Sequence, residues 1–162
     1  MKGIYFILGS NLGDRLYFIG KAKQWIEQLI GPIVNKSAFY ETEPWGFATE
    51  NLFLNQVIEV NTFMLPAEIL ESIKTIEKGL GRVKGNERYV SRNIDIDILF
   101  YGEKIIQEPD LQIPHSEIQN RKFVLIPLAE LAGEFEHPVL HQTINELLQH
   151  CKDTCSVKKL YV

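Results

Sequence analysis

Residues 94–101, with the sequence IDIDILFY, constrain the fold of this chain more than any other segment. Apolar residues stand at every second position from the first isoleucine, which is the period of a β-strand with one face on a hydrophobic core. The intervening positions begin with two carboxylates, Asp95 and Asp97, and then turn apolar at Leu99 and Tyr101. The second face of the expected strand therefore matches neither a solvent-exposed face nor a buried one.

The spacing of the two aspartates is typical of a metal site. Side chains at i and i+2 of a strand point to the same side about 6.5 Å apart, so Asp95 and Asp97 can share one ion or hold two. Their oxygens are hard ligands that favour Mg²⁺, which takes one or two protein carboxylates and completes its shell with water and phosphate oxygens. The alternative is an exposed strand face that binds nothing.

The segment immediately before this strand is basic. Residues 82–92 carry four basic side chains against Glu87, a local charge of +3 in a chain whose formal net charge is −4. The four are Arg82, Lys84, Arg88 and Arg92. Three glycines between 79 and 85, and the lack of an apolar period, predict a loop whose charges can reach an anion. Beside a magnesium site this loop indicates polyphosphate binding, and the alternative is a solvated loop whose arginines pair with Glu87 and its neighbours.

Composition narrows the class of protein. With 162 residues, of which 45% are hydrophobic and 23% charged, the chain is expected to form one globular domain over 1–162. The acidic net charge argues against nucleic acid as a partner, because binding it requires a broad basic surface. The apolar run at 4–8 is too short for a secretion signal or a membrane span, so we expect a cytoplasmic protein without membrane association.

The two cysteines, Cys151 and Cys155, are expected to be reduced thiols. Together with His137, His141 and His150 they could suggest a metal site, but their spacing fits no common zinc template. We therefore expect no zinc centre in this part of the chain.

Periodicity and turn residues predict the remaining elements. The expected strands are 2–8, 33–40, 52–63 and 94–101, with a loop at 9–13 and a short hairpin through Gly102 into 104–107. The expected helices run from Asp14 to the Gly-Pro pair at 31–32, from Pro66 to about Gly79, over 121–132 and over 143–150. The helical residues expected to face the core are Ile19, Ala22, Ile26, Leu29, Ile69, Leu70, Ile73 and Ile76. The βαββαβ order favours an α+β fold with a mainly antiparallel sheet over a doubly wound parallel sheet.

Several motifs together resemble one enzyme family. The sequence RYVSRNIDIDILFYG is followed by IPHSEIQNRKFVLIPLAEL, and both are preceded by GSNLGD near the N-terminus, YETEPWG at 40–46 and FLNQV at 53–57. These motifs, in this order, closely resemble 6-hydroxymethyl-7,8-dihydropterin pyrophosphokinase of folate biosynthesis. The resemblance implies a ferredoxin-like α+β core with additional C-terminal helices. It also implies transfer of the two terminal phosphates of ATP, as one unit, to the pterin hydroxymethyl group with release of AMP.

The resemblance also implies roles for individual residues. Asp95 and Asp97 match the pair that holds two Mg²⁺ ions between the ATP phosphates and the pterin hydroxyl. Residues at phosphate- or nucleotide-binding positions are Lys84, Arg92, Ile98, His115, Ser116 and Arg121, and Arg82 matches a further basic residue of the catalytic loop. Residues at pterin-binding positions are Thr42, Glu43, Trp45, Phe53, Asn55, Asp95 and Phe123. Within this pocket the two phenylalanines match the rings that sandwich the pterin, and the asparagine matches the amide that bonds its edge.

The chain departs from the family pattern in the basic loop and in the pterin pocket. Tyr89, Val90 and Ser91 stand where the family commonly has Trp-Gly-Pro, and Lys84 stands where it often has arginine, which alone forms a bidentate fork to phosphate. Phe53 replaces a frequent tyrosine and so keeps the stacking surface without the hydroxyl. The departures bear on loop closure and ATP affinity more than on pterin recognition.

The implied reaction requires positioning and electrostatics rather than a protein nucleophile. The pterin hydroxyl attacks the β-phosphorus of ATP in line, and the expected partners are these two small molecules, bound by a monomer. The alternatives are a Mg²⁺-dependent nucleotidyltransferase or nuclease, which would release pyrophosphate or nucleotides instead of AMP, and a non-catalytic nucleotide-binding domain. Taken one at a time, Phe53 and Phe123 could be core aromatics, His115 a turn cap and Arg121 a surface charge.

Overall fold

A six-stranded antiparallel sheet forms the centre of the computed structural model, which describes residues 3–43, 51–81 and 93–162. Its strands are β1 (Ile4–Ser10), β2 (Ile33–Lys36), β3 (Phe39–Thr42), β4 (Phe53–Val60), β5 (Asp95–Tyr101) and β8 (Val157–Leu160). Their order is β5-β1-β4-β3-β8, with β2 also paired to β4. A separate two-stranded sheet contains β6 (Ile106–Glu108) and β7 (Leu111–Ile113).

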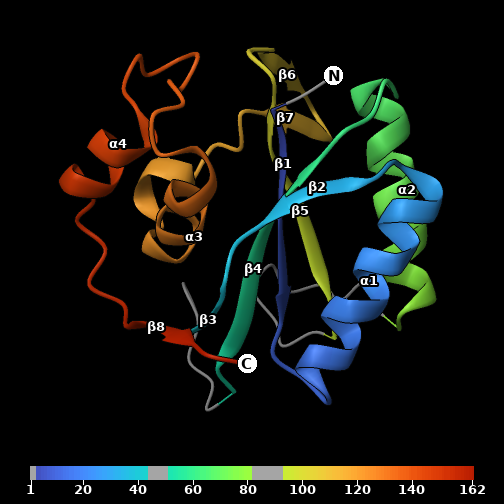
Figure 1. Cartoon of the computed structure of the whole chain (residues 1–162). Coiled ribbons are helices and arrows are strands. Elements are labelled where there is room, and N and C mark those ends of the chain that lie inside the picture. The colour runs from blue at the N-terminus through green and yellow to red at the C-terminus, as the bar shows by residue number, and fades with distance from the viewer. Residues whose placement is uncertain (1–2, 44–50, 82–92) are drawn as a thin grey trace.

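Helices cover both faces of the large sheet. One face carries α1 (Arg15–Leu29) and α2 (Pro66–Gly79), and the other carries α3 (Lys122–Ala132) and α4 (Ile144–His150), as Figure 1 shows. The connection β1-α1-β2/β3-β4-α2-β5, with each strand antiparallel to its neighbours, confirms the expected ferredoxin-like core with additional C-terminal helices. Among the described residues, no helix is both long enough and apolar enough to cross a bilayer.

Two hydrophobic clusters fill the space on the two sides of the sheet. The first lies under α1 and α2 and contains Phe6, Ile26 and Ile76, while the second lies under α3 and α4 and contains Ile7 and Leu128. Helix α1 begins as predicted, because the Asp14 carboxylate accepts the N–H of Tyr17 at 3.0 Å. A sheet with helices on both faces explains why the second face of β5 turns apolar.

The alternation along β5 breaks at Leu99. In the pairing with β1, Ile98 and Phe100 oppose adjacent residues of that strand, so Leu99 is one extra residue and forms a bulge. The bulge directs Phe100 into the cluster under α3 and α4, and Tyr101 into the cluster under α1 and α2. The prediction that these two residues continue the alternation was wrong for that reason.

Other boundaries also differ from the predictions. Strand β1 continues through Ser10, so Gly9 lies in the sheet rather than in a loop. The strand expected at 33–40 is two strands separated at Ser37, whose hydroxyl and carbonyl bond β4 in place of regular pairing. The hairpin strand expected at 104–107 is instead β6 at Ile106–Glu108, which pairs with β7 and not with β5, and the C-terminal strand β8 was not predicted.

The helical core residues agree with the prediction in all but two cases. Leu29 is 45% exposed at the end of α1, and Leu70 of α2 is only partly buried. The six that are buried as expected are Ile19, Ala22, Ile26, Ile69, Ile73 and Ile76. Leu70 packs against the edge of this core and also lines a cavity between α2 and β5, so part of its side chain is exposed.

Candidate active site

One row of residues runs across the adjacent strands β4, β1 and β5, near the N-terminal end of β5. The pairing registers place Asn55 of β4 opposite Gly9 of β1, and Gly9 opposite Asp95 of β5. The next row contains Val57, Ile7 and Asp97. Directly paired residues project to the same face of an antiparallel sheet, and Ile7 belongs to the α3 and α4 side. Asn55 and both aspartates therefore project toward α3.

Gly9 leaves room in this row for the side chain of Asn55. A Cβ atom at position 9 would lie 2.9 Å from Oδ1 of Asn55 and 3.6 Å from Cδ1 of Phe53, and the first distance is too short for a real contact. Any side chain here would displace the amide of Asn55. Gly9 was not among the predicted site residues, although a glycine inside a strand is itself a signal of close approach by another group.

Asn55 is oriented by Thr42. Both residues are buried, and Nδ2 of Asn55 donates to Oγ1 of Thr42 at 2.8 Å. This bond joins the ends of β3 and β4 and leaves the carbonyl oxygen of Asn55 directed toward Gly9. Glu43 follows Thr42, and its backbone N–H donates to the carbonyl of Ser156 at 3.4 Å.

The first turn of α3 brings an aromatic ring and a cation to the same side of the sheet. Phe123 is partly buried against the α3-side core, and the guanidinium of Arg121 lies 5.8 Å from its ring centroid. The start of the helix is fixed by Asp153, whose carboxylate accepts the N–H of Lys122 at 3.0 Å. Phe53, in contrast, comes from the first position of β4, where it pairs with Thr42.

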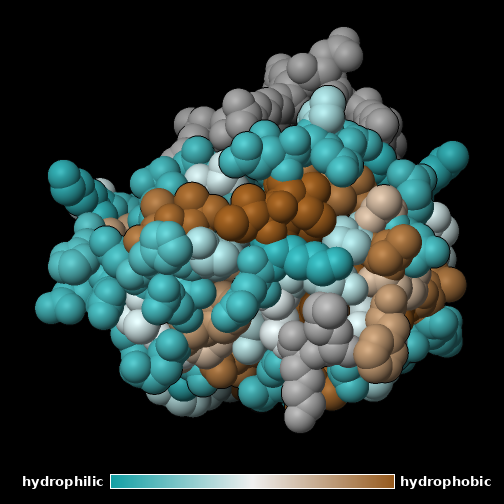
Figure 2. Space-filling view, turned by 90° about the horizontal axis from the view of Figure 1, so that it is seen from above, coloured by the Kyte–Doolittle hydropathy of each residue, from teal (hydrophilic) through white to brown (hydrophobic). Residues whose placement is uncertain are grey.

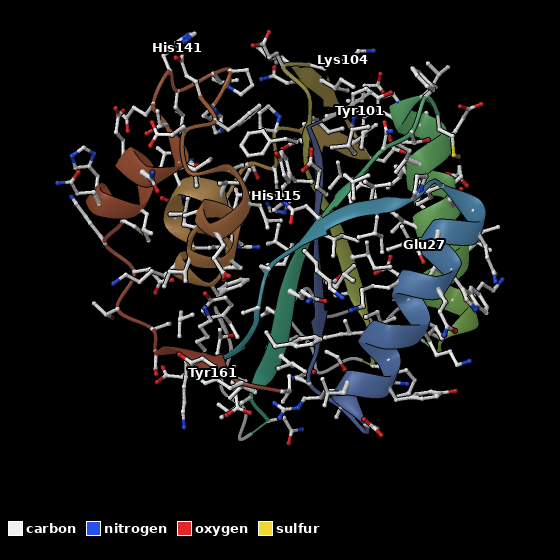
Figure 3. All side chains as sticks on the ribbon, viewed as in Figure 1. Glu27, Tyr101, Lys104, His115, His141 and Tyr161 are labelled. Carbon is white, nitrogen blue, oxygen red and sulfur yellow. The ribbon has the colours of Figure 1, made fainter. Side chains whose placement is uncertain are left out.

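His115 lies beside the aspartate pair. Its backbone N–H donates to the carbonyl of Leu99 at 3.0 Å, which ties the segment after the cis Ile113–Pro114 bond to β5. Its Nδ1 accepts the N–H of Glu117 at 3.2 Å, and its Nε2 lies 3.9 Å from Oδ2 of Asp97. Because Nδ1 accepts, the neutral ring carries its proton on Nε2. Figure 3 shows His115 between α3 and the sheet.

The His115 ring is neutral at physiological pH. Burial and the nearby positive charge of Arg121 lower its pKa to about 4, and the opposing effects of Asp95 and Glu117 are smaller. Nε2 therefore offers an uncharged hydrogen-bond donor next to Asp97. Such a group can bind a phosphate oxygen without adding a full positive charge.

A cavity of about 270 Å³ adjoins Asp97 and His115. Its apolar wall comes from α2 and β5 and includes Leu70, Ile73 and Ile98, while Gln112 and Ser116 contribute polar groups. Nucleotide binding was expected of four described residues. Three of them, Ile98, His115 and Ser116, line this cavity, and Arg121 does not. Leu70 and Ile73 were predicted only as core residues.

A second cavity, of about 490 Å³, lies on the opposite side of the 114–116 segment. It opens between β6–β7 and the segment that precedes α4, and its lining includes Ile105, Val139 and Leu140. Figure 2, which views the molecule from that end, shows a band of apolar side chains across the middle of the surface. Neither aspartate of the pair lines this cavity, so the smaller cavity is the better candidate for a nucleotide.

The carboxylates of Asp95 and Asp97 suit magnesium better than a transition metal. The described part of the chain contains no cluster of three or more histidine, cysteine or acidic side chains that could enclose an ion. Asp97 keeps 36% of its side chain exposed, and Asp95 is also partly exposed, so two oxygen ligands stand beside room for water and phosphate. Cys151 and Cys155 are free thiols, and His137 instead accepts two backbone N–H groups through Nδ1.

Residues 5–133 match the model of a family described as 7,8-dihydro-6-hydroxymethylpterin-pyrophosphokinase. The chain belongs to this family. It is 38% identical over 146 residues to the 2-amino-4-hydroxy-6-hydroxymethyldihydropteridine pyrophosphokinase of Aquifex aeolicus, with 90% of each chain covered. It is 39% identical over 135 residues to the protein of the same name from Porphyromonas gingivalis, with 82% of this chain and 92% of that one covered.

The fold agrees with a solved member of the family. The crystal structure of Plasmodium falciparum HPPK-DHPS is similar with a TM-score of 0.73 at 21% identity, over 92% of this chain and 43% of that one. The chain therefore spans less than half of that longer protein, and the likeness shows the fold alone. Family membership confirms the predicted resemblance and makes this protein an enzyme, a diphosphotransferase of folate biosynthesis.

Four of the expected site residues lie outside the described residues. They are Trp45, Arg82, Lys84 and Arg92. Their expected roles, and the effect of the Tyr89-Val90-Ser91 departure, stay predictions. The described residues bring together the aspartate pair, His115 and the cavity of about 270 Å³ on one side, and Thr42, Asn55 and Gly9 on the other.

Proposed function

We propose that this pyrophosphokinase transfers the β- and γ-phosphates of ATP, as one unit, to the hydroxymethyl group of 6-hydroxymethyl-7,8-dihydropterin and releases AMP. The observation that carries the proposal is the row Asn55–Gly9–Asp95, which joins an amide, a glycine that makes room for this amide and a carboxylate across three strands. A flat ring bound over Gly9 would present its edge to Asn55 and its substituent to Asp95. The nucleotide cavity begins at Asp97, two residues further along β5.

Pterin selectivity comes from stacking and from hydrogen bonds that the wrong ring would leave unpaired. Phe53 and Phe123 supply apolar faces from β4 and α3. Asn55 reads donors and acceptors on the ring edge, and the Thr42 hydroxyl keeps the amide in its orientation. Glu43 and Trp45, which follow β3 in the sequence, are proposed to complete the pocket.

ATP occupies the cavity between α2, β5 and the 109–116 segment. Leu70, Ile73 and Ile98 contact the base, and Nε2 of His115 donates to a phosphate oxygen beside Asp97. Arg121 contributes positive charge from the start of α3. Arg82, Lys84 and Arg92 are proposed to add the charge that the transferred group requires.

Two Mg²⁺ ions, held by Asp95 and Asp97, would supply the Lewis acidity that lowers the pKa of the pterin hydroxyl and neutralises the phosphate oxygens. The protein's own groups place the hydroxyl oxygen in line with the β-phosphorus. A new bond forms between these two atoms, and the bond from the β-phosphorus to the α–β bridging oxygen breaks. That oxygen leaves on AMP, and the hydroxyl proton passes to solvent.

Product analysis tests the proposal. The purified protein is incubated with Mg²⁺, the pterin and ATP labelled at the β-phosphorus, and the products are separated by chromatography. We expect one AMP for each labelled pterin diphosphate, and loss of both products when EDTA removes the metal. Release of ADP, or of labelled inorganic pyrophosphate with a nucleotidylated pterin, would contradict it.

A substitution at Gly9 tests the floor of the pterin pocket. Gly9→Ala is expected to raise the KM for pterin at least about 10-fold, because the new methyl group displaces the Asn55 amide. The KM for ATP should change by less than about twofold, since the nucleotide cavity does not include position 9.

Gly20→Ala is the matched control. A Cβ at position 20 of α1 has no neighbouring heavy atom within 4 Å, so the change should leave both KM values unaltered and favour the helix by up to about 1 kcal/mol. Equal pterin kinetics in Gly9→Ala and Gly20→Ala would remove Gly9 from the pocket.

A further inference from the structure

Glu77 is a buried carboxylate that contacts the strand segment carrying the aspartate pair. It lies in the last turns of α2 and is 8% exposed. Its Oε2 accepts the backbone N–H of Ile96 at 3.2 Å. Ile96 is the residue between Asp95 and Asp97, so the contact is made to the backbone that carries both carboxylates.

We propose that Glu77 is a positioning residue, whose hydrogen bond to Ile96 holds Asp95 and Asp97 at the spacing that divalent cations require. This inference rests on the proposed metal role of the two aspartates. Glu77 comes from α2, and it would act on the two aspartates through the backbone of Ile96.

The position of β5 in the sheet explains why such a contact is needed. β5 is the edge strand in the order β5-β1-β4-β3-β8, so β1 is its only partner among the described strands. In an antiparallel strand, alternate residues direct their backbone groups to opposite sides, and the N–H of Ile96 points outward to Glu77. An unpaired edge is free to twist or to change its pairing. Glu77 supplies the acceptor that a neighbouring strand would otherwise supply.

The cost of burying Glu77 supports a specific role. A carboxylate loses hydration when it is buried, and two further carboxylates lie on the adjacent strand. Helix α2 nevertheless places an acidic side chain here, in line with the buried Ile69, Ile73 and Ile76. Groups that orient metal ligands commonly change metal affinity about 10- to 100-fold when they are removed.

Two substitutions separate the hydrogen bond from the charge. Glu77→Ala removes the acceptor, whereas Glu77→Gln keeps a side-chain oxygen of the same reach without the charge. We expect Glu77→Ala to raise the Mg²⁺ concentration for half-maximal activity at least about 10-fold while the KM for pterin changes less than about twofold. Glu77→Gln should stay within about threefold of the wild type in both quantities.

Two measurements that do not depend on turnover accompany the kinetics. Mn²⁺ binding, followed by electron paramagnetic resonance in the presence of a non-hydrolysable ATP analogue, should weaken in Glu77→Ala by the same factor as the Mg²⁺ response. Amide hydrogen exchange at Ile96 should be faster in Glu77→Ala and near the wild-type rate in Glu77→Gln. A change that only destabilised the fold would speed exchange along all of β5 and lower activity at every Mg²⁺ concentration.

Glu68 provides the matched control in the same helix. Its Oε2 also accepts a backbone N–H, that of Leu65 at 2.8 Å, but at the opposite end of α2. Glu68→Ala should lower stability and leave the Mg²⁺ response and Mn²⁺ affinity unchanged.

The inference is overturned if Glu77→Ala shows the wild-type Mg²⁺ response and Ile96 exchange, or if Glu77→Gln is as impaired as Glu77→Ala. The second result would assign the effect to charge instead of positioning. Because Glu77→Gln keeps the hydrogen bond, its behaviour decides the question even if Glu77→Ala does not fold. A wild-type protein without Mg²⁺-dependent activity would instead contradict the proposed function itself.

Discussion

Asp97→Ala is expected to lower kcat at least about 100-fold, which corresponds to about 2.7 kcal/mol of transition-state stabilisation. The carboxylate stands at the junction of the nucleotide cavity and the pterin row, with Nε2 of His115 3.9 Å from its Oδ2. Its removal eliminates a proposed metal ligand at the point where phosphate charge is proposed to develop. Asp95→Ala, one row closer to Asn55, should have an effect of similar size. Steady-state rates at saturating ATP, pterin and Mg²⁺ give the comparison.

Glu103→Ala is a suitable control for the loss of an acidic side chain. Glu103 is exposed and follows the other end of β5, away from the aspartate pair. Its replacement should leave kcat within about twofold, as is usual for an exposed residue without specific partners. A near-wild-type rate in Asp97→Ala or Asp95→Ala would remove that residue from the metal site.

Asn55→Ala is expected to reduce kcat/KM for pterin about 100-fold and to leave the KM for ATP nearly unchanged. The change removes the group that reads the ring edge, and it also leaves the buried Thr42 hydroxyl without its 2.8 Å partner. For a pterin analogue that lacks the matching edge groups, the same substitution should reduce kcat/KM by a much smaller factor. Kinetics with the two compounds measure the difference.

Gln56→Ala controls for the loss of a buried amide. Gln56 is the next residue of β4 and projects to the opposite face, where it accepts from Lys23 and donates to the carbonyl of Ser37. Its replacement should lower the free energy of unfolding by about 1–3 kcal/mol without a change in pterin affinity. If the two variants lost pterin affinity equally, a general loosening of β4 would explain the effect better than edge recognition.

Local sequence patterns predicted much of the fold because they reflect local physics. The period of two in residues 94–98 correctly placed Ile94, Ile96 and Ile98 against one core, and the Asp14 cap correctly placed the start of α1. The bulge at Leu99 could not be read in the same way, since it arises from pairing with β1, which lies more than eighty residues earlier. Phe100 and Tyr101 were assigned to the wrong faces as a result.

Long-range pairing also accounts for the missed elements. β8 has two lysines among its four residues and lacks an apolar run, and it becomes a strand by pairing with β3. The segment 104–107 contains two isoleucines, but the strand that forms is Ile106–Glu108, and it pairs with β7 because the chain leaves the large sheet after Gly102. In each case the partner, not the segment itself, decides the structure.

The spacing of the aspartate pair predicts the proposed metal site, and the family resemblance supplies most of the other proposed site residues. Neither source predicts that Gly9 lies between Asn55 and Asp95, because that neighbourhood depends on the register of three strands. Glu77 was missed for a related reason. In the sequence it is one more acidic residue of an amphipathic helix, and only the packing of α2 against β5 brings it to Ile96.

The measurement that tests the central claim most directly is a crystal structure of the protein with Mg²⁺, a non-hydrolysable ATP analogue and 6-hydroxymethyl-7,8-dihydropterin. The account predicts the pterin ring over Gly9 with its edge on Asn55, metal ions on Asp95 and Asp97, and the adenine base against Leu70 and Ile98. A pterin bound away from the Asn55–Gly9–Asp95 row, or metal ions that contact neither aspartate, would contradict it.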